Sequence, residues 1–275
     1  MKEYVMTMPI DLVLVRHGES EGNIAERLSR KGDDTVFTPD FRQRHSSQWR
    51  LTKTGIRQAR IVGKWLKKEF AGPPHFDRYY ASEYIRAMET AAHLDLPRAK
   101  WYAEHYLRER DWGKLECIPH RERKEQFAHD LARKDSDPYF WRPPQGEMLV
   151  DLCLRIDRVI DTLHRECRDQ RVLIVCHGEV MWAFRIRLER LSQERFRELT
   201  QDARPEQQIH NGQVLHYSRR DPKSGELSAT LNWMRSVCPE HPEWSDKKEW
   251  QSIVRPTYSN SALLTRAQNT PRQIG

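Results

Sequence analysis

Leu12-Val13-Leu14-Val15-Arg16-His17-Gly18-Glu19-Ser20 is the stretch that decides the fold of this chain. Its four leading apolar residues predict a short buried strand. An arginine and a histidine follow at the point where that strand ends. Open α/β sheets bind their ligands outside the carboxyl ends of the strands. The sequence therefore puts a fixed cation and an imidazole where such sheets do chemistry.

A second apolar run, at 172–176, ends in the same way, with His177-Gly178-Glu179. A single histidine after a strand is more often a hydrogen-bonded structural residue than a nucleophile. Two strands that each deliver a histidine followed by a glycine are hard to explain by packing alone. The pair therefore indicates a functional site, and packing remains the alternative for either histidine taken singly.

Strand and helix patterns alternate along most of the chain. We expect strands at 10–15, 76–81, 101–107, 172–176, 213–217 and 229–234, and helices at 54–70, 83–94, 147–167, 180–191 and 193–199. This alternation predicts an α/β fold, a three-layer α/β/α sandwich around a mostly parallel central sheet.

The 275 residues contain no linker-like middle segment and no internal repeat, so we expect one domain over 1–237. The polar segment 24–50 carries turn signals and predicts a long loop insertion. The charged segment 114–145 predicts a surface helix or lid over the site. The polar, proline-punctuated segment 238–275 predicts a C-terminal tail.

The composition favours a cytoplasmic protein with anionic ligands. The formal net charge is +7, and 32% of residues are charged. The five cysteines are scattered without a CxxC pair, which is typical of idle thiols in a reducing compartment. Neither a signal peptide nor a membrane-length apolar stretch is recognisable, so we expect no membrane partner. We expect no nucleic-acid partner either, because basic residues interleaved with aromatic ones are missing.

Five short motifs occur in a fixed order. They are Arg16-His17-Gly18-Glu19-Ser20 with Asn23; Leu51-Thr52-Lys53-Thr54-Gly55-Ile56-Arg57-Gln58-Ala59; Ser82 with Arg86-Ala87 and Thr90-Ala91; Leu107-Arg108-Glu109 with Gly113 and Glu116; and His177-Gly178. Together they resemble the signature of the histidine phosphatase superfamily, branch 1, whose members have a phosphoglycerate-mutase-like fold. The resemblance covers residues 10–217.

The resemblance implies a phosphomonoester hydrolase that forms a phosphohistidine. It implies three catalytic residues, with His17 as nucleophile, Glu109 as general acid and base, and His177 as the partner histidine. The phosphate-binding residues that it implies are Arg16, Arg86, Asn23 and Gly178. Arginines and a second histidine can stabilise a phosphoryl group, so we expect neither a metal nor another cofactor. The expected partner is a small phosphorylated substrate or a phosphoprotein.

Two other functions remain open, because the superfamily contains mutases and members that have lost catalysis. Phosphoglycerate mutases carry a long insertion after the acid, whereas Glu109 and Gly146 are only 37 positions apart here. Three cations of the short insert, Arg121, Arg123 and Lys124, are candidates for binding a second anionic group, although a solvated helix is the commoner use of such residues. We therefore favour a phosphatase.

Several residues depart from the family pattern or compete for a role. Asp111 is a rival for the acid, since it lies in the same charged run as Glu109. The long segment 24–50 holds cations that are candidates for capping the pocket, namely Arg42, Arg44, His45 and Arg50. Family arginine, serine and glycine positions are occupied by Trp182, Met148 and Cys117. None of these changes removes a group from the catalytic set.

Overall fold

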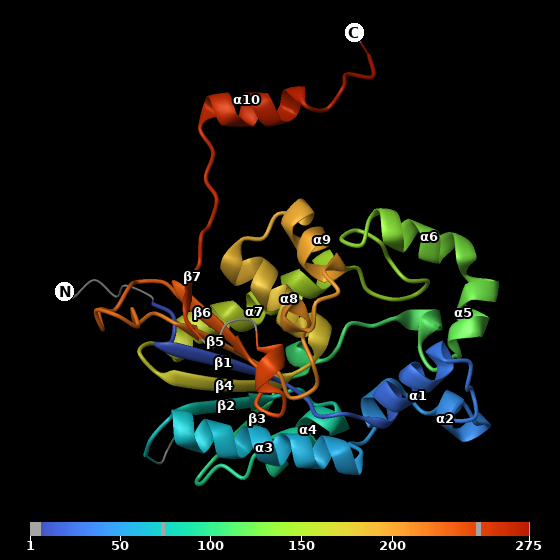
Figure 1. Ribbon diagram of the computed structural model, residues 1–275, viewed down its shortest axis with the longest axis horizontal. Coiled ribbons are helices and arrows are strands. Elements are labelled where there is room, and N and C mark those ends of the chain that lie inside the picture. The colour runs from blue at the N-terminus through green and yellow to red at the C-terminus, as the bar shows by residue number, and fades with distance from the viewer. Residues whose placement is uncertain (1–6, 73–74, 246–248, 275) are drawn as a thin grey trace.

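The computed structural model describes residues 7–72, 75–245 and 249–274 (Figure 1). In this part of the chain, seven strands form one sheet in the order β3-β2-β4-β1-β5-β6-β7. Four of them form a parallel half: β1 (Asp11–Arg16), β2 (Arg78–Ala81), β3 (Trp101–Ala103) and β4 (Arg171–Cys176). Each remaining strand is antiparallel to its neighbour: β5 (Val214–Ser218), β6 (Trp233–Val237) and β7 (Gln251–Ser252).

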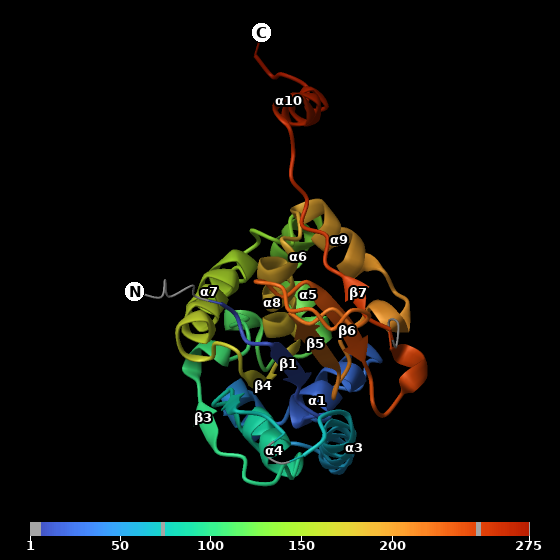
Figure 2. The same ribbon diagram turned by 90° about the vertical axis from the view of Figure 1, so that its left-hand side faces the viewer.

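Helices cover both faces of the sheet, which confirms the three-layer α/β fold (Figures 1 and 2). One face packs against α3 (Lys53–Glu69) and α4 (Ile85–His93). The other packs against α7 (Leu149–Glu166), α8 (Gly178–Glu189) and α9 (Gln193–Gln201).

Strand β1 explains why its apolar run is continuous rather than alternating. Leu12 and Leu14 belong to the core formed with α7 and α8, whereas Val13 and Val15 belong to the core formed with α3 and α4. Successive side chains of a strand point to opposite faces, so a strand buried on both sides needs apolar residues at every position. The same reasoning applies to β4 next to it, which is equally buried.

Four helices form a cap beyond the carboxyl ends of the parallel strands (Figure 1). They are α1 (Glu21–Arg30), α2 (Pro39–Gln43), α5 (His120–Gln126) and α6 (Ala128–Ser136). The sequence prediction of a loop over 24–50 was wrong, because α1, α2 and the 3-10 turn η1 (Ser46–Gln48) lie there. Helix α1 buries mainly small residues, Gly22, Ala25 and Ser29, so it lacks the large apolar stripe by which helices are recognised.

The remaining 3-10 turns connect these elements. They are η2 (His105–Leu107), η3 (Gly113–Leu115), η4 (Pro205–Gln207) and η5 (Pro242–Trp244). The lid segment predicted over 114–145 holds η3, α5 and α6. Helix α5 joins α1 through the Ser29 hydroxyl, which accepts a hydrogen bond of 2.7 Å from the backbone nitrogen of His120.

The first part of the segment 238–275 belongs to the folded domain and is not a tail. Cys238 is buried, and β7 pairs with β6. The Arg255 guanidinium donates to the carbonyl oxygens of Leu188 and Leu231 at 2.8 and 2.6 Å. The last helix, α10 (Asn260–Gln268), stands away from the layers in both views (Figures 1 and 2). We therefore propose that the domain ends near residue 255 and not at 237.

Three smaller points complete the fold. The strand predicted at 229–234 begins later, at Trp233, as β6. All five cysteines are buried and free. Among the described helices, none has both the length and the apolar character required to cross a bilayer.

Candidate active site

The register of the sheet brings the two histidines together. Arg16 and Cys176 are the last paired residues of the parallel strands β1 and β4, so the residues that follow them leave the sheet side by side. The backbone nitrogen of His17 donates to the carbonyl oxygen of Cys176 at 3.0 Å. The ring centroids of His17 and His177 are 5.1 Å apart.

The hydrogen bonds of His17 define which ring nitrogen carries the proton. Nδ1 lies 2.7 Å from the carbonyl oxygen of Gly18, which can only accept, so Nδ1 is the donor. Nε2 lies 3.1 Å from Nε of Arg86, which can only donate, so Nε2 keeps its lone pair. Burial, and then the charges of Arg86 and Arg16, hold the pKa of His17 well below its usual value. The imidazole is therefore neutral, with an unprotonated Nε2 whose lone pair accepts the hydrogen bond from Arg86.

Two glycines let the loop of His17 pack directly on the start of α3. A Cβ on Gly18 would lie 2.3 Å from the carbonyl oxygen of Gly55, and a Cβ on Gly55 would lie 2.1 Å from that of Glu19. The backbone nitrogen of Gly18 donates to the Thr90 hydroxyl at 3.1 Å. These contacts join three of the sequence motifs and fix the histidine loop.

Two arginines flank the histidine pair: Arg16 is half-buried and Arg86 is buried. Arg16 donates through Nη1 to the carbonyl oxygen of Ile209 at 2.6 Å, while its buried Nε has no hydrogen-bond partner among the described residues. Arg86 donates through Nη1 to the carbonyl oxygen of Ser46 at 2.7 Å. Burial lowers the pKa of both guanidiniums, but arginine stays charged in proteins. A buried N–H without an acceptor beside a second cation is suited to bind an anion.

His177 contributes a second unused polar atom. Its Nε2 lies 2.8 Å from the Ser82 hydroxyl, and its buried Nδ1 has no hydrogen-bond partner in the described part of the chain. Burial, and then the charges of Arg86 and His17, lower the pKa of His177 well below its usual value. When Ser82 donates to Nε2, the proton is on Nδ1, which can then donate to a bound oxyanion.

The other two residues expected to bind phosphate lie beside this pair. Gly178 is the first residue of α8, and a Cβ there would lie 3.4 Å from Nε of Arg16. The Oδ1 atom of Asn23 accepts hydrogen bonds from the backbone nitrogen of Ser20 at 3.0 Å and from Nδ2 of Asn211 at 3.1 Å. Because the oxygen of Asn23 is used within the protein, its NH₂ group is the end suited to a ligand oxygen.

Of the two candidate acids, Glu109 is the one in the cavity. It lines the same cavity as His17 and Arg86, and its charge counters the effect of burial on the pKa of Arg16. Asp111 is exposed, and its carboxylate accepts a hydrogen bond of 2.7 Å from the backbone nitrogen of Gly113. Asp111 therefore caps a local turn, and the geometry favours Glu109 as the acid.

Arg155 holds the segment that carries Glu109, a role that sequence analysis missed. This buried α7 side chain donates to the carbonyl oxygens of Tyr106 and Arg108 at 2.5 and 3.2 Å. The carboxylate of Glu147 pairs with the same guanidinium at 2.6 and 2.8 Å. A basic residue within an amphipathic helix usually faces solvent, so nothing in the pattern of α7 marks it.

His17 and Glu109 line a cavity of about 300 Å³ whose other walls come from the cap, whereas His177 contacts the His17 ring but is not part of this lining. Its aromatic lining comes from Phe37, Phe41, Trp49 and Trp112, and its outer cations are Arg30, Arg123 and Lys134. The four cations expected to cap the pocket lie outside this lining. Three of them form ion pairs: Arg42 with Glu122, Arg44 with Glu21, and Arg50 with Glu89.

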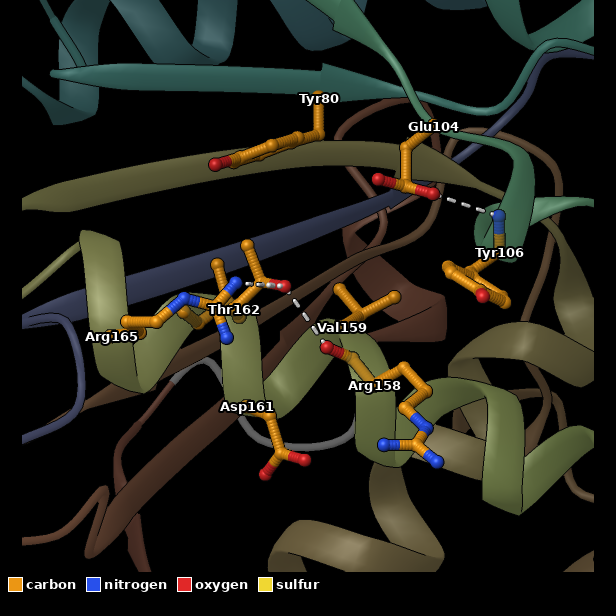
Figure 3. A pocket seen from close by; sticks show the side chains of 9 residues that line it. Tyr80, Glu104, Tyr106, Arg158, Val159, Asp161, Thr162 and Arg165 are labelled. Carbon is orange, nitrogen blue, oxygen red and sulfur yellow. Dashed lines mark hydrogen bonds between the residues drawn. The ribbon is translucent and has the colours of Figure 1, made fainter.

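A second hollow, of about 250 Å³, lies between η2 and α7 (Figure 3). Several of its polar groups bond to one another. Glu104 accepts from the backbone nitrogen of Tyr106 at 3.0 Å, and the Thr162 hydroxyl donates to the carbonyl oxygen of Arg158 at 3.1 Å. None of its described lining residues is a histidine. The cavity at the strand ends is therefore the candidate active site.

Of the departures from the family pattern, Trp182 has a packing role, whereas Cys117 lines the candidate cavity. Trp182 packs edge-on against Phe196, and the guanidinium of Arg185 lies 4.6 Å from the Trp182 ring centroid. Arg185 also pairs with Glu189, which accepts a hydrogen bond of 2.7 Å from the Tyr217 hydroxyl.

Within the described residues, no group of three His, Cys, Asp or Glu side chains is arranged to hold a metal ion.

Similar proteins include both mutases and phosphatases. The chain is 31% identical over 212 residues to a 2,3-bisphosphoglycerate-dependent phosphoglycerate mutase of Methylobacterium radiotolerans, covering 75% of this chain and 88% of that protein. It is 31% identical over 173 residues to 6-phosphofructo-2-kinase/fructose-2,6-bisphosphatase of Aquarana catesbeiana. That match covers 63% of this chain but only 31% of the length of the bifunctional relative.

Solved structures share the fold at lower identity. The alpha-ribazole phosphatase of Shigella flexneri matches with a TM-score of 0.58 and 22% identity, over 80% of this chain and 96% of that one. A mycobacterial glucosyl-3-phosphoglycerate phosphatase matches with a TM-score of 0.58 and 21% identity, over 76% and 90% of the two chains. The family model of the histidine phosphatase superfamily (branch 1) matches residues 12–206. The chain therefore belongs to the histidine phosphatase superfamily, branch 1.

Proposed function

We propose that this protein is a phosphomonoester hydrolase that works through a phosphohistidine on Nε2 of His17. The observation that carries the proposal is the state of that nitrogen. It is unprotonated, because Arg86 donates a hydrogen bond to it. Near it, the buried Nε of Arg16 and Nδ1 of His177 have no hydrogen-bond partner among the described residues and can bind an anion. Attack on a phosphate ester requires an unprotonated nucleophile next to fixed cations, and Nε2 becomes available when Arg86 turns its N–H to a phosphoryl oxygen.

In the first step, Nε2 of His17 attacks phosphorus, and the bond from phosphorus to the ester oxygen breaks. Arg16, Arg86 and Nδ1 of His177 bind the three phosphoryl oxygens, on which the negative charge is spread. Asn23 and the backbone N–H of Gly178 add donors at the edge of the same site. Glu109 gives its proton to the departing alcohol oxygen, so the leaving group departs neutral.

In the second step, Glu109 takes a proton from water as the water oxygen attacks phosphorus. The bond from phosphorus to Nε2 breaks, and inorganic phosphate leaves. Glu109 and His17 return to their starting protonation states, so protons balance over the cycle. In this proposal, Arg155 positions Glu109 through the backbone of the segment that precedes it.

Mutase activity is the second candidate, favoured by the 31% identity to a phosphoglycerate mutase. We expect hydrolysis to dominate, because the insert between Glu109 and Gly146 is short and leaves the phosphohistidine open to water. Phosphate release should need no bisphosphate primer, and 3-phosphoglycerate should be isomerised poorly. Formation of 2-phosphoglycerate measured beside phosphate release decides between the two. Isomerisation much faster than hydrolysis would make the protein a mutase.

Chelators should leave activity unchanged, because Arg16 and Arg86 supply the positive charge that a metal provides elsewhere. The check is phosphate release from an aryl phosphate before and after dialysis against EDTA. A loss of activity on dialysis, restored by magnesium or zinc, would contradict the proposed chemistry.

A further inference from the structure

The cavity extends well beyond the catalytic groups. Residues along the whole length of helix α1 line it, so their spacing indicates how long the cavity is. Gly22 and Asn23 line it near His17, Glu26 lines it one turn further along, and Arg30 lines it at the end of the helix. An α-helix rises 1.5 Å per residue, so Asn23 and Arg30 are separated by about 10 Å along the axis. A ligand that reaches from the phosphate site to Arg30 is therefore longer than a three-carbon acid.

The middle of this cavity is aromatic and rigid. The Trp49 ring is stacked on Phe41 with 5.4 Å between centroids and an angle of 10° between planes. Helix α1 also packs against Trp49 through a glycine, since a Cβ on Gly22 would lie 2.1 Å from Cε3 of Trp49. Trp112, Leu115 and Leu131 line the same cavity from η3 and α6. A flat apolar group fits such walls better than a hydroxylated chain does.

The outer end of the cavity is cationic. Glu26 pairs with both Arg30 and Arg123, at 2.8 and 2.7 Å, so one carboxylate serves two guanidiniums. The buried Nε of Arg123 has no hydrogen-bond partner among the described residues. Nζ of Lys134 lies 4.9 Å from the Trp112 ring centroid. Glu179 is a second carboxylate whose charge acts on Lys134, so the three cations outnumber two carboxylates. The remaining positive charge and the unused donor of Arg123 suit a second anion.

Building on the proposed function, we propose that the substrate is a phosphomonoester whose alcohol carries an apolar ring and, beyond that ring, a second anionic group. The phosphate occupies the histidine site, the ring lies against Trp49 and Trp112, and the anion meets Arg123 and Lys134. Small polar acids such as 3-phosphoglycerate leave the aromatic walls unfilled, so they should be poor substrates.

Four phosphate esters of primary alcohols test this, because their leaving groups are alike. They are ethyl phosphate, benzyl phosphate, 4-(2-carboxyethyl)benzyl phosphate and its uncharged carboxamide. We expect kcat/KM for benzyl phosphate to exceed that for ethyl phosphate by about tenfold or more, from burial of the ring. We expect the carboxylate to exceed the carboxamide by about tenfold, from bonds to charged groups.

Lys134→Met should lower the ratio of kcat/KM between carboxylate and carboxamide toward one. The matched control is Lys124→Met, which changes an exposed lysine of the same cap outside the cavity and should keep the wild-type ratio. Equal kcat/KM values for ethyl and benzyl phosphate, or for carboxylate and carboxamide, would overturn the proposed substrate class but would leave the proposed hydrolase activity intact. No phosphate release from any of the four esters would overturn the proposed function and this inference with it.

Discussion

Replacing His17 with alanine is expected to lower turnover of an aryl phosphate by about 10⁴-fold or more, because the variant lacks the atom that attacks phosphorus. The loss should appear in kcat, since Arg16, Arg86 and His177 remain to bind phosphate. Steady-state phosphate release by the wild type and the variant measures the effect. Circular dichroism and the melting temperature should show that the variant is folded.

His129→Ala is the matched control for this prediction. His129 is an exposed histidine of α6 that does not line the cavity, so its removal should leave kcat unchanged. Full activity in His17→Ala would contradict the proposed mechanism, whatever the behaviour of the control.

Replacing Glu109 with glutamine should slow phosphoenzyme formation by about 10²–10⁴-fold for alkyl phosphates, whose leaving oxygen needs a proton. Glutamine keeps the shape of the side chain but cannot give up or take a proton. Aryl phosphates should lose less in this step, because a phenolate leaves more easily. Rapid-quench measurement of the first turnover with both ester types separates this step from the later hydrolysis.

Asp111→Asn is the control for Glu109, since Asp111 is the rival acid in the same charged run. Asp111 is exposed and bonded to the Gly113 backbone, so its loss should affect both ester types equally and weakly. Equal losses for alkyl and aryl phosphates in Glu109→Gln, or a larger loss in Asp111→Asn, would move the role to Asp111.

The sequence predicted the site best where a catalytic residue comes directly after a strand. The apolar runs before His17 and His177 predict two strands buried on both faces, and such strands lie at the centre of an α/β sheet. Their parallel register then brings the histidines within 5.1 Å of each other, although 160 residues separate them. The ordered motifs added Arg86 and Glu109, which also line the cavity.

The residues that form the walls of the cavity could not be predicted from the sequence. Helix α1 was read as part of a loop because it packs through small residues, of which Gly22 accommodates Trp49. Nothing in the pattern says that Trp49 stacks on Phe41, or that Arg123 pairs with Glu26 from another helix. Such contacts depend on how the cap segments meet in space, which neither periodicity nor spacing encodes.

The C-terminal segment was misjudged for a similar reason. Its anchors are isolated aromatic and basic side chains, not a periodic pattern. Trp250 packs against His216 with 4.6 Å between ring centroids, and Arg255 bonds to two carbonyl oxygens of the domain. A strand of two residues such as β7 is too short to give an alternating pattern.

The central claim is that a phosphoryl group is transferred to Nε2 of His17. The most direct test is rapid quench of the full chain with an aryl phosphate labelled with ³²P, followed by proteolysis and mapping of the label. The proposal predicts a base-stable, acid-labile phosphohistidine on the peptide that contains His17, as the isomer phosphorylated on Nε2, formed and lost fast enough to be an intermediate. Label on another residue, or hydrolysis without any labelled enzyme at times shorter than one turnover, would contradict it.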